Sequence, residues 1–236
     1  MRCVINLFLI TIGLFLLTSQ FLASKTIADP IKLYGDEIYF DVFRKGDKVG
    51  YHSVKFFKDD GSLTVRIDFS LEIDFLFLTA YQFKYLSEAK WVEGQLDHLK
   101  ASVNDDGEKF KVTANRQNQL IYVVGTNGKF NTPAPIFPTN HWNVDVVNHT
   151  LVLNTLTGLL NTVSITAQGS ETIPTENGPI NATRYSYSGD LKNEVWYDNE
   201  GRWVKMRFEA SDGSIIDYVC KRCQSKALVK VSHAAY

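Results

Sequence analysis

The stretch that most constrains the fold of this chain is residues 64–75, where apolar and polar side chains alternate without interruption. The apolar positions are Val65, Ile67, Phe69, Leu71, Ile73 and Phe75. Successive side chains of a β-strand point to opposite faces, whereas an α-helix would spread these residues around its circumference. The stretch therefore predicts a long strand with one buried face and one face in water.

The same alternation recurs along the chain, and turn-forming residues separate the runs. Asp-Gly and Asn-Gly pairs, as at residues 60–61 and 127–128, supply the positive φ angles that tight hairpins need. We predict strands at residues 37–44, 48–58, 63–76, 79–92, 95–104, 108–115, 119–125, 159–168, 180–188, 192–198, 202–210 and 214–221. Long antiparallel strands that are wet on one face indicate an all-β fold, either a curved sheet or an open half-barrel meander.

The segment near residues 132–160 breaks this pattern. It contains Pro133, Pro135 and Pro138, and proline removes the donors that a central strand requires. Thr139 is placed to cap a short helical turn over residues 141–147. Residues 151–160 are apolar and fit either a strand or a helix. We expect this helical or loop segment to cover one open end of the sheet.

The N-terminus has the pattern of a secretory signal peptide. Arg2 precedes an apolar run from Val4 to Leu17, which matches an apolar region of roughly 7–15 residues. A membrane-spanning helix needs about 20 apolar residues, so the run is short for an anchor, although an uncleaved anchor is the alternative. Cleavage after Ala28 divides the chain into a signal peptide at 1–28 and a single β-rich domain at 29–236. The pattern predicts an exported protein, periplasmic or secreted, with no stable membrane anchor after cleavage.

The charge of the exported domain excludes one class of partner. Removing Arg2 and Lys25 leaves 23 Lys plus Arg against 26 Asp plus Glu, a net charge of −3. Nucleic-acid binding calls for a basic stripe or patch, so we expect no nucleic acid partner. Export also means that no nucleotide is expected, and we predict no cofactor.

Cys220 and Cys223 are the two cysteines outside the predicted signal peptide. A local structural disulfide is the favoured interpretation, because oxidising compartments allow disulfides. A redox-active pair would need a helix N-terminus, yet the pair follows the strand-like residues 215–219. Half of a zinc site would need a second ligand pair with suitable spacing, which the sequence lacks.

Several short segments, taken in order, resemble a known family. They are Tyr39–Val42 with Val49–His52, Ala89–Gly94, Trp142-Asn143, and Val195–Asp198 with Gly201–Val204. The set is similar to an uncharacterised family of exported proteobacterial proteins that carries a domain of unknown function. It is distantly similar in layout to periplasmic half-barrel carriers of lipoproteins. The resemblance implies a periplasmic curved sheet, and it implies no activity and no catalytic residues.

The candidate binding residues are aromatic side chains and histidines. Tyr81, Phe83 and Tyr85 alternate on one face of a predicted strand, and Phe69, Phe75, Met206 and Phe208 add to the apolar surface. His52 falls on a mostly apolar face, where a core or cavity histidine is favoured over a catalytic base. The predicted ligand-binding set is His52, Tyr81, Phe83, Tyr85, His141, Trp142 and Asn143.

The cluster His141-Trp142-Asn143 has two interpretations. It orients a polar head group at the mouth of a cavity, or Trp142 plugs one end of the barrel while Asn143 ties down the loop backbone. The sequence predicts no metal ligands.

The leading hypothesis is a non-enzymatic protein that binds an apolar or amphipathic ligand, lipid-like or otherwise from the cell envelope, on the concave face of the sheet. The alternatives are a structural or envelope-interaction protein with a plugged sheet, and a hydrolase that uses His141 or His52. The hydrolase ranks below the other two, because no serine lies in a Gly-x-Ser-x-Gly elbow.

Overall fold

The computed structural model describes residues 29–76, 78–126 and 128–225. The predicted signal peptide, its cleavage site and Cys3 lie outside the described residues. The described chain is almost entirely antiparallel β-structure in one large curved sheet, which confirms the predicted fold class. Among the described residues, no helix has the length and apolar character needed to cross a membrane.

Two short helices and fifteen strands make up the described chain. The helices are α1 (Pro30–Tyr34) and the 3-10 helix η1 (Val144–Asn148). The strands are β1 (Glu37–Arg44), β2 (Asp47–Asp59), β3 (Ser62–Phe75), β4 (Leu78–Val92), β5 (Gln95–Asp105), β6 (Glu108–Gln117), β7 (Leu120–Gly125), β8 (Gly128–Pro133), β9 (Phe137–Pro138), β10 (Leu151–Leu153), β11 (Leu160–Ile173), β12 (Ile180–Gly189), β13 (Glu194–Asp198), β14 (Trp203–Glu209) and β15 (Ile215–Arg222).

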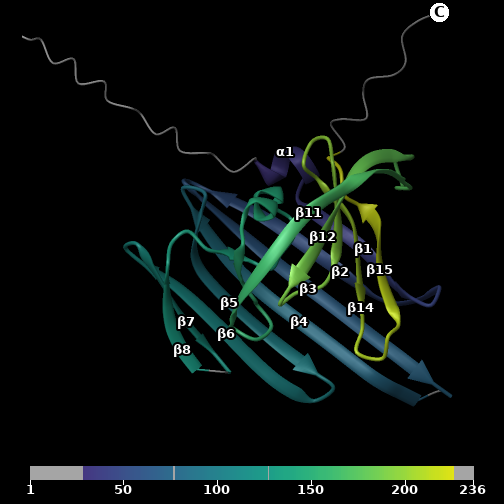
Figure 1. Ribbon diagram of the computed structural model, residues 1–236, viewed down its shortest axis with the longest axis horizontal. Helices are drawn as coiled ribbons and strands as arrows, with labels where there is room; N and C mark the ends of the chain where they lie inside the picture. The colour runs from purple at the N-terminus through teal and green to yellow at the C-terminus, as the bar shows by residue number, and fades with distance from the viewer. Residues whose placement is uncertain (1–28, 77, 127, 226–236) are drawn as a thin grey trace, which may run out of the picture.

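The strands form one sheet in the order β8-β7-β6-β5-β4-β3-β2-β1-β15-β14-β13-β12-β11-β10-β9. Most strands that follow one another in sequence also pair with one another in the sheet. Strand β1 pairs with β15, and this pair joins the run β1–β8 to the run β9–β15. The sheet curls strongly, so that β11 and β12 cross in front of β3 and β4 (Figure 1). Ring contact between Phe69 of β3 and Tyr218 of β15, 5.7 Å between centroids, places both on the inner face.

The predicted strands agree with the structure, except that β8 and β9 were not predicted and β11 is longer, and the helical turn also differs in position. Strand β8 was not predicted, because Pro133 suggested a break, yet proline is tolerated at the end of this edge strand. Strand β11 continues to Ile173, beyond the predicted end at residue 168. The helical turn begins at Val144, and its N-cap is Asn143 instead of Thr139, because the Asn143 side chain accepts from the Asp145 N–H at 3.0 Å.

Residues 134–159, called the plug segment below, pass into the interior of the curled sheet. Trp142 is 2% exposed and packs edge-to-face against Trp91 and Phe56, with centroids 5.4 Å and 5.6 Å away. The Tyr34 hydroxyl donates to the Trp142 carbonyl at 2.9 Å, and the Tyr197 hydroxyl donates to the His141 carbonyl at 2.9 Å. Buried backbone needs such partners, so these tyrosines hold the segment in place. The part of the interior around Trp142 is called the filled half below.

The apolar stretch at residues 151–160 combines both strand and turn. It forms β10, then a turn, and then enters β11 at Leu160. The turn rests on the end of β7, where a Cβ on Gly125 would lie 2.9 Å from the Thr157 carbonyl oxygen. This close approach of two backbones requires glycine at residue 125.

Cys220 and Cys223 are joined by a disulfide at the end of β15, as predicted. Both half-cystines are buried, and Cys220 faces Phe40 across the β1–β15 pair. The disulfide therefore lies beside the hydrophobic core of the sheet.

Candidate functional site

The plug segment leaves part of the interior open, as a cavity of 360 Å³. This volume is within the range of about 300–1,000 Å³ typical of small-molecule sites. The part of the interior around this cavity is called the open half below. Its lining comes from β2, β3, β4, β14 and β15, from the plug segment, and from the loop between β12 and β13.

Two neighbouring strands supply the largest apolar wall of the cavity. Strand β3 contributes Phe69, Leu71 and Ile73, which face Tyr85, Phe83 and Tyr81 of β4 directly across the antiparallel pair. Because side chains alternate along each strand, all six fall on the inner face together. Met206 and Phe208 of β14 also line the cavity. The predicted Tyr81, Phe83 and Tyr85 thus lie side by side in the cavity, while the side chain of Phe75 lies outside the described part of the chain.

His52 of β2 lines the cavity among aromatic rings. Its ring centroid is 5.5 Å from that of Phe69, 5.3 Å from that of Trp203 and 5.4 Å from that of Tyr218. Neither ring nitrogen has a hydrogen-bond partner among the described residues. Burial, with a smaller contribution from His141, lowers the pKa of His52 to about 3, so the ring is neutral at pH 7.

His141, from the plug segment, also lines the cavity. Its Nδ1 is 3.4 Å from the Tyr187 hydroxyl, which is the one hydrogen-bond partner of its ring among the described residues. Burial lowers the pKa of His141 to about 4, so this ring is neutral at pH 7 as well. Among the described residues that line the cavity, the buried side chains therefore include two uncharged imidazoles and no cation.

Two further polar groups at the cavity have no partner among the described residues. Tyr218 is 3% exposed, lines the cavity and makes no hydrogen bond through its hydroxyl, whose pKa burial alone raises. Asn193 lines the cavity and has a buried, unpartnered Oδ1. Buried tyrosine hydroxyls normally find a partner. An apolar cavity with a few unpaired polar groups suits an amphipathic ligand.

Trp142 and Asn143 do not line the cavity. Trp142 lies in the filled half, and Asn143 caps η1. The sequence alone did not single out Tyr218 or the loop residues Leu191, Lys192 and Asn193, all of which line the cavity. Alternation of Ile216, Tyr218 and Cys220 was a usable signal for Tyr218, whereas the loop residues carry no periodic pattern.

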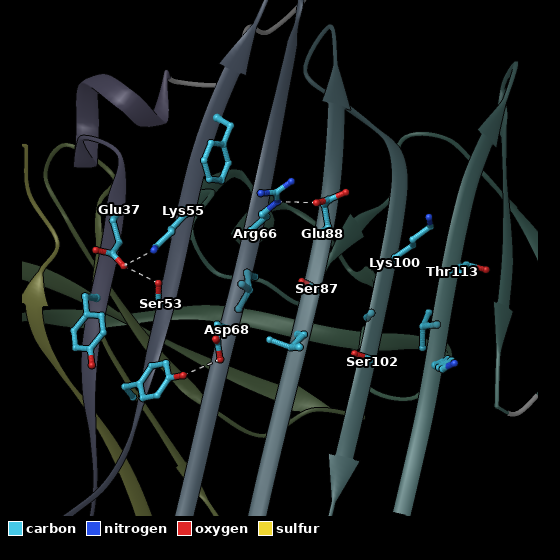
Figure 2. Close-up of a pocket in the computed structure, with 18 residues that line it drawn as sticks. Glu37, Ser53, Lys55, Arg66, Asp68, Ser87, Glu88, Lys100, Ser102 and Thr113 are labelled. Atoms are coloured by element: carbon cyan, nitrogen blue, oxygen red, sulfur yellow. Dashed lines mark hydrogen bonds and ion pairs between the residues drawn. The ribbon is translucent and has the colours of Figure 1, made fainter.

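A second hollow, of 860 Å³, crosses the outer face of β1–β6 (Figure 2). Some of its charged groups are paired: Arg66 Nε donates to Glu88 at 2.7 Å, and an Asp68 oxygen lies 2.6 Å from Nζ of Lys84. Lys100 and Lys111 line the groove without an ion pair to a described residue. The Ser53 hydroxyl donates to Glu37 at 2.8 Å. The groove is larger than the cavity, and its acidic residues Glu37, Asp68 and Glu88 are all paired within the protein.

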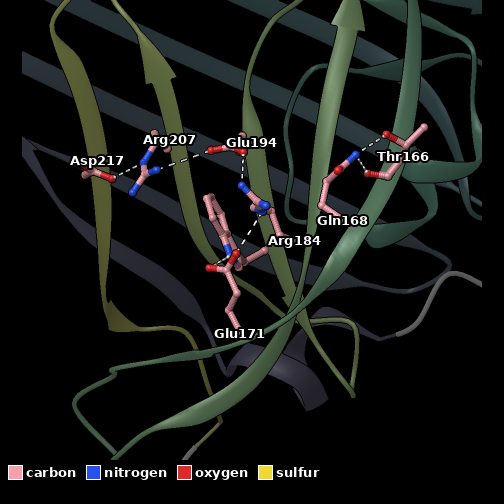
Figure 3. A network of polar contacts seen from close by, with 8 residues as sticks. Thr166, Gln168, Glu171, Arg184, Glu194, Arg207 and Asp217 are labelled. Atoms are coloured by element: carbon pink, nitrogen blue, oxygen red, sulfur yellow. Dashed lines mark hydrogen bonds and ion pairs between the residues drawn. The ribbon is translucent and has the colours of Figure 1, made fainter.

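A cluster of polar side chains lies on the outer face of the strands β11–β15 (Figure 3). The Trp196 Nε1–H donates to Glu171 at 3.1 Å, and Lys205 lies over the Trp196 ring at 4.5 Å. Arg184 bridges Glu171 and Glu194, at 3.1 Å and 2.8 Å. This chain of contacts buries an outward-facing tryptophan and links neighbouring strands, so we interpret it as structural.

Comparison with known proteins agrees with the fold. Residues 40–221 match the family described as a domain of unknown function (DUF6134). The chain belongs to this family. This confirms that the resemblance to an uncharacterised family is correct.

The DUF6134 domain is also similar in structure to a β-barrel-like protein of a domain of unknown function, DUF1849, from Brucella abortus, with a TM-score of 0.57 and 10% identity. The alignment covers 79% of this chain and 95% of the other. At this identity the likeness concerns the fold alone. Among curated proteins, none matches the chain.

The arrangement of serines bears on the hydrolase alternative. Ser53 points to the outer face and donates to Glu37, and Ser87 is buried without a partner. No serine hydroxyl bonds to a histidine ring within the part of the chain that the structure describes. The nucleophile–base contact that such chemistry uses is not assembled around His52 or His141.

Proposed function

We propose that the DUF6134 domain is a non-enzymatic binding protein that holds an apolar or amphipathic molecule in the cavity of its open half. The observation that carries this proposal is a cavity walled by aromatic and aliphatic side chains of β3, β4 and β14 and containing buried polar groups without partners. Covering apolar surface stabilises a protein by about 25 cal/mol for every Å² removed from water, so a ligand that covers this wall gains that free energy on binding.

On this proposal, the ligand is a molecule of the cell envelope. The N-terminal residues have the pattern of an export signal, which makes lipid-like molecules the natural candidates for an exported binding protein. The lipid-binding role and the periplasmic location stand together as parts of one proposal. Cell fractionation of the full-length chain tests the location, and cytoplasmic retention of the mature domain would contradict it.

Binding is tested with a series of straight-chain alcohols of increasing length, measured by calorimetry and by native mass spectrometry after gentle purification. Each methylene that enters the cavity is expected to strengthen binding by about 0.8 kcal/mol, or about fourfold, until the cavity is full. A protein that is purified without a ligand and binds none of the alcohols would contradict the proposal.

Matched variants identify which hollow is used. Ala210 lines the inner cavity and Ser102 lines the outer groove, so each is changed to leucine. Ala210→Leu is expected to weaken alcohol binding at least tenfold, whereas Ser102→Leu leaves it unchanged. The reverse pattern would place the site in the outer groove.

The structural alternative rests on the filled half, where the plug segment already covers the inner face. An envelope-interaction protein of this kind would need no ligand. A protein that is stable without a ligand and binds no alcohol of the series would favour this second function.

A further inference from the structure

The charge at the mouth of the cavity indicates the kind of head group that the ligand carries, an inference that rests on the proposed function. The lining residues divide by exposure into a floor and a mouth. Tyr85, Tyr218 and His141 are at most 5% exposed and form the floor. Leu156, at 38% exposed, and the exposed Lys192 mark the mouth.

Lys192 is the one residue with a full charge at pH 7 among those that line the cavity. It makes no ion pair with any described residue. The acidic residues nearest to it in sequence are engaged elsewhere. Asp190 accepts from the Thr162 N–H at 2.7 Å, and Glu194 pairs with Arg184 at 2.8 Å. The ammonium is therefore free to meet an anion at the mouth.

The floor cannot hold that anion. The two histidines that line the cavity, His52 and the floor residue His141, are neutral at pH 7, and a carboxylate beside them would lose its hydration without gaining a counter-charge. An ionised head group is therefore stable only at the mouth, with its hydrocarbon chain directed to the floor. The unpartnered Tyr218 and Asn193 then lie along the path of the chain.

We propose that the cavity takes a single-chain amphiphile with an anionic head group, such as a long-chain carboxylate, with the chain inside and the carboxylate against Lys192. The cavity volume of 360 Å³ is at the lower end of the range for small-molecule sites, which favours one hydrocarbon chain over two. Lys192 is a specificity-determining residue in this arrangement.

The test compares three probes with the same chain, namely decanoate, decanol and decyltrimethylammonium, by calorimetry with the full mature domain at pH 7.5. The wild-type protein is expected to bind decanoate about three- to tenfold more tightly than decanol, the effect of one charge-assisted contact in a partly exposed setting. The trimethylammonium probe is expected to bind most weakly. Added salt should reduce the preference for decanoate, because it screens the exposed pair.

Lys192→Gln should weaken decanoate binding more than decanol binding and so remove the preference for decanoate, whereas Lys192→Arg should retain the preference. Lys100→Gln is the matched control, because Lys100 lines the outer groove and makes no ion pair with a described residue. Equal affinity of the wild-type protein for decanoate and decanol, or an unchanged preference in Lys192→Gln, would overturn the inference while leaving the proposed function intact. Failure of all three probes to bind would overturn both.

Discussion

The two halves of the interior share strands β2 and β4, yet their apolar inner faces are covered differently. In the filled half, Trp142 of the plug segment packs on Trp91, and tyrosine hydroxyls bond to the backbone of the segment. In the open half, Phe69 and Phe83 line a cavity. The difference shows that the plug segment covers one part of the inner face and leaves a cavity over the other.

The largest contrast is expected from large-to-small substitutions. Trp142→Ala in the filled half should lower the free energy of unfolding by about 3–5 kcal/mol, because it leaves a cavity within packed surroundings. Phe83→Ala in the open half should cost about 1 kcal/mol, because its ring already borders empty space. Urea denaturation of both variants measures the difference, and equal losses would abolish the distinction between the halves.

The second-largest effect is expected from lowering the pH, which should reduce the free energy of unfolding through the two histidines that line the open half. His52 and His141 have lowered pKa values in the folded protein, so the unfolded chain takes up protons first as the pH falls. Stability is therefore full above pH 6.5 and is lost toward pH 4, at about 1.4 kcal/mol per pH unit for each histidine.

The variant His52→Phe isolates one of these contributions. Between pH 7 and 4.5 it should lose about 2.5 kcal/mol less than the wild-type protein, with each variant referred to its own stability at pH 7. Parallel stability curves for the two proteins would show that His52 is not held neutral in the interior.

The interior of the sheet was only partly predictable from the sequence. Alternation along residues 64–75 places the apolar wall of β3 correctly, because a period of two depends only on the strand itself. By contrast, His141 and Trp142 are consecutive, yet His141 lines the cavity and Trp142 packs in the filled half. Their separation depends on where the plug segment meets distant strands, which no local pattern encodes. The role proposed for Lys192 likewise depends on its position at the mouth of the cavity, which no local pattern encodes.

Added volume should also distinguish the halves. Ala114 of β6 is 1% exposed in the packed core, so Ala114→Leu should cost about 1–3 kcal/mol through overpacking. Ala210→Leu fills part of the cavity and should change the free energy of unfolding by about 0.5 kcal/mol or less. Thermal unfolding of the pair checks this, and a large loss in Ala210→Leu would mean that the open half is already closely packed.

The smallest effect is expected on the outer face. Arg66 and Glu88 pair at 2.7 Å, but their side chains are 59% and 48% exposed. Arg66→Gln should therefore cost about 0.5 kcal/mol, and salt should reduce the loss further. A loss as large as that of Ala114→Leu would show that the outer groove contributes to stability as the core does.

The most direct test of ligand binding in the open half uses Met206, which lines the cavity and is the one methionine besides Met1. The protein is labelled with ¹³C at the methionine methyl groups, and Met206→Leu assigns the signal. The account predicts that saturating decanol or decanoate shifts the Met206 methyl resonance, and that the shift disappears in a variant with a blocked cavity, Ala210→Leu. A Met206 resonance that stays in place while an amphiphile binds elsewhere, or while none binds at all, would contradict it.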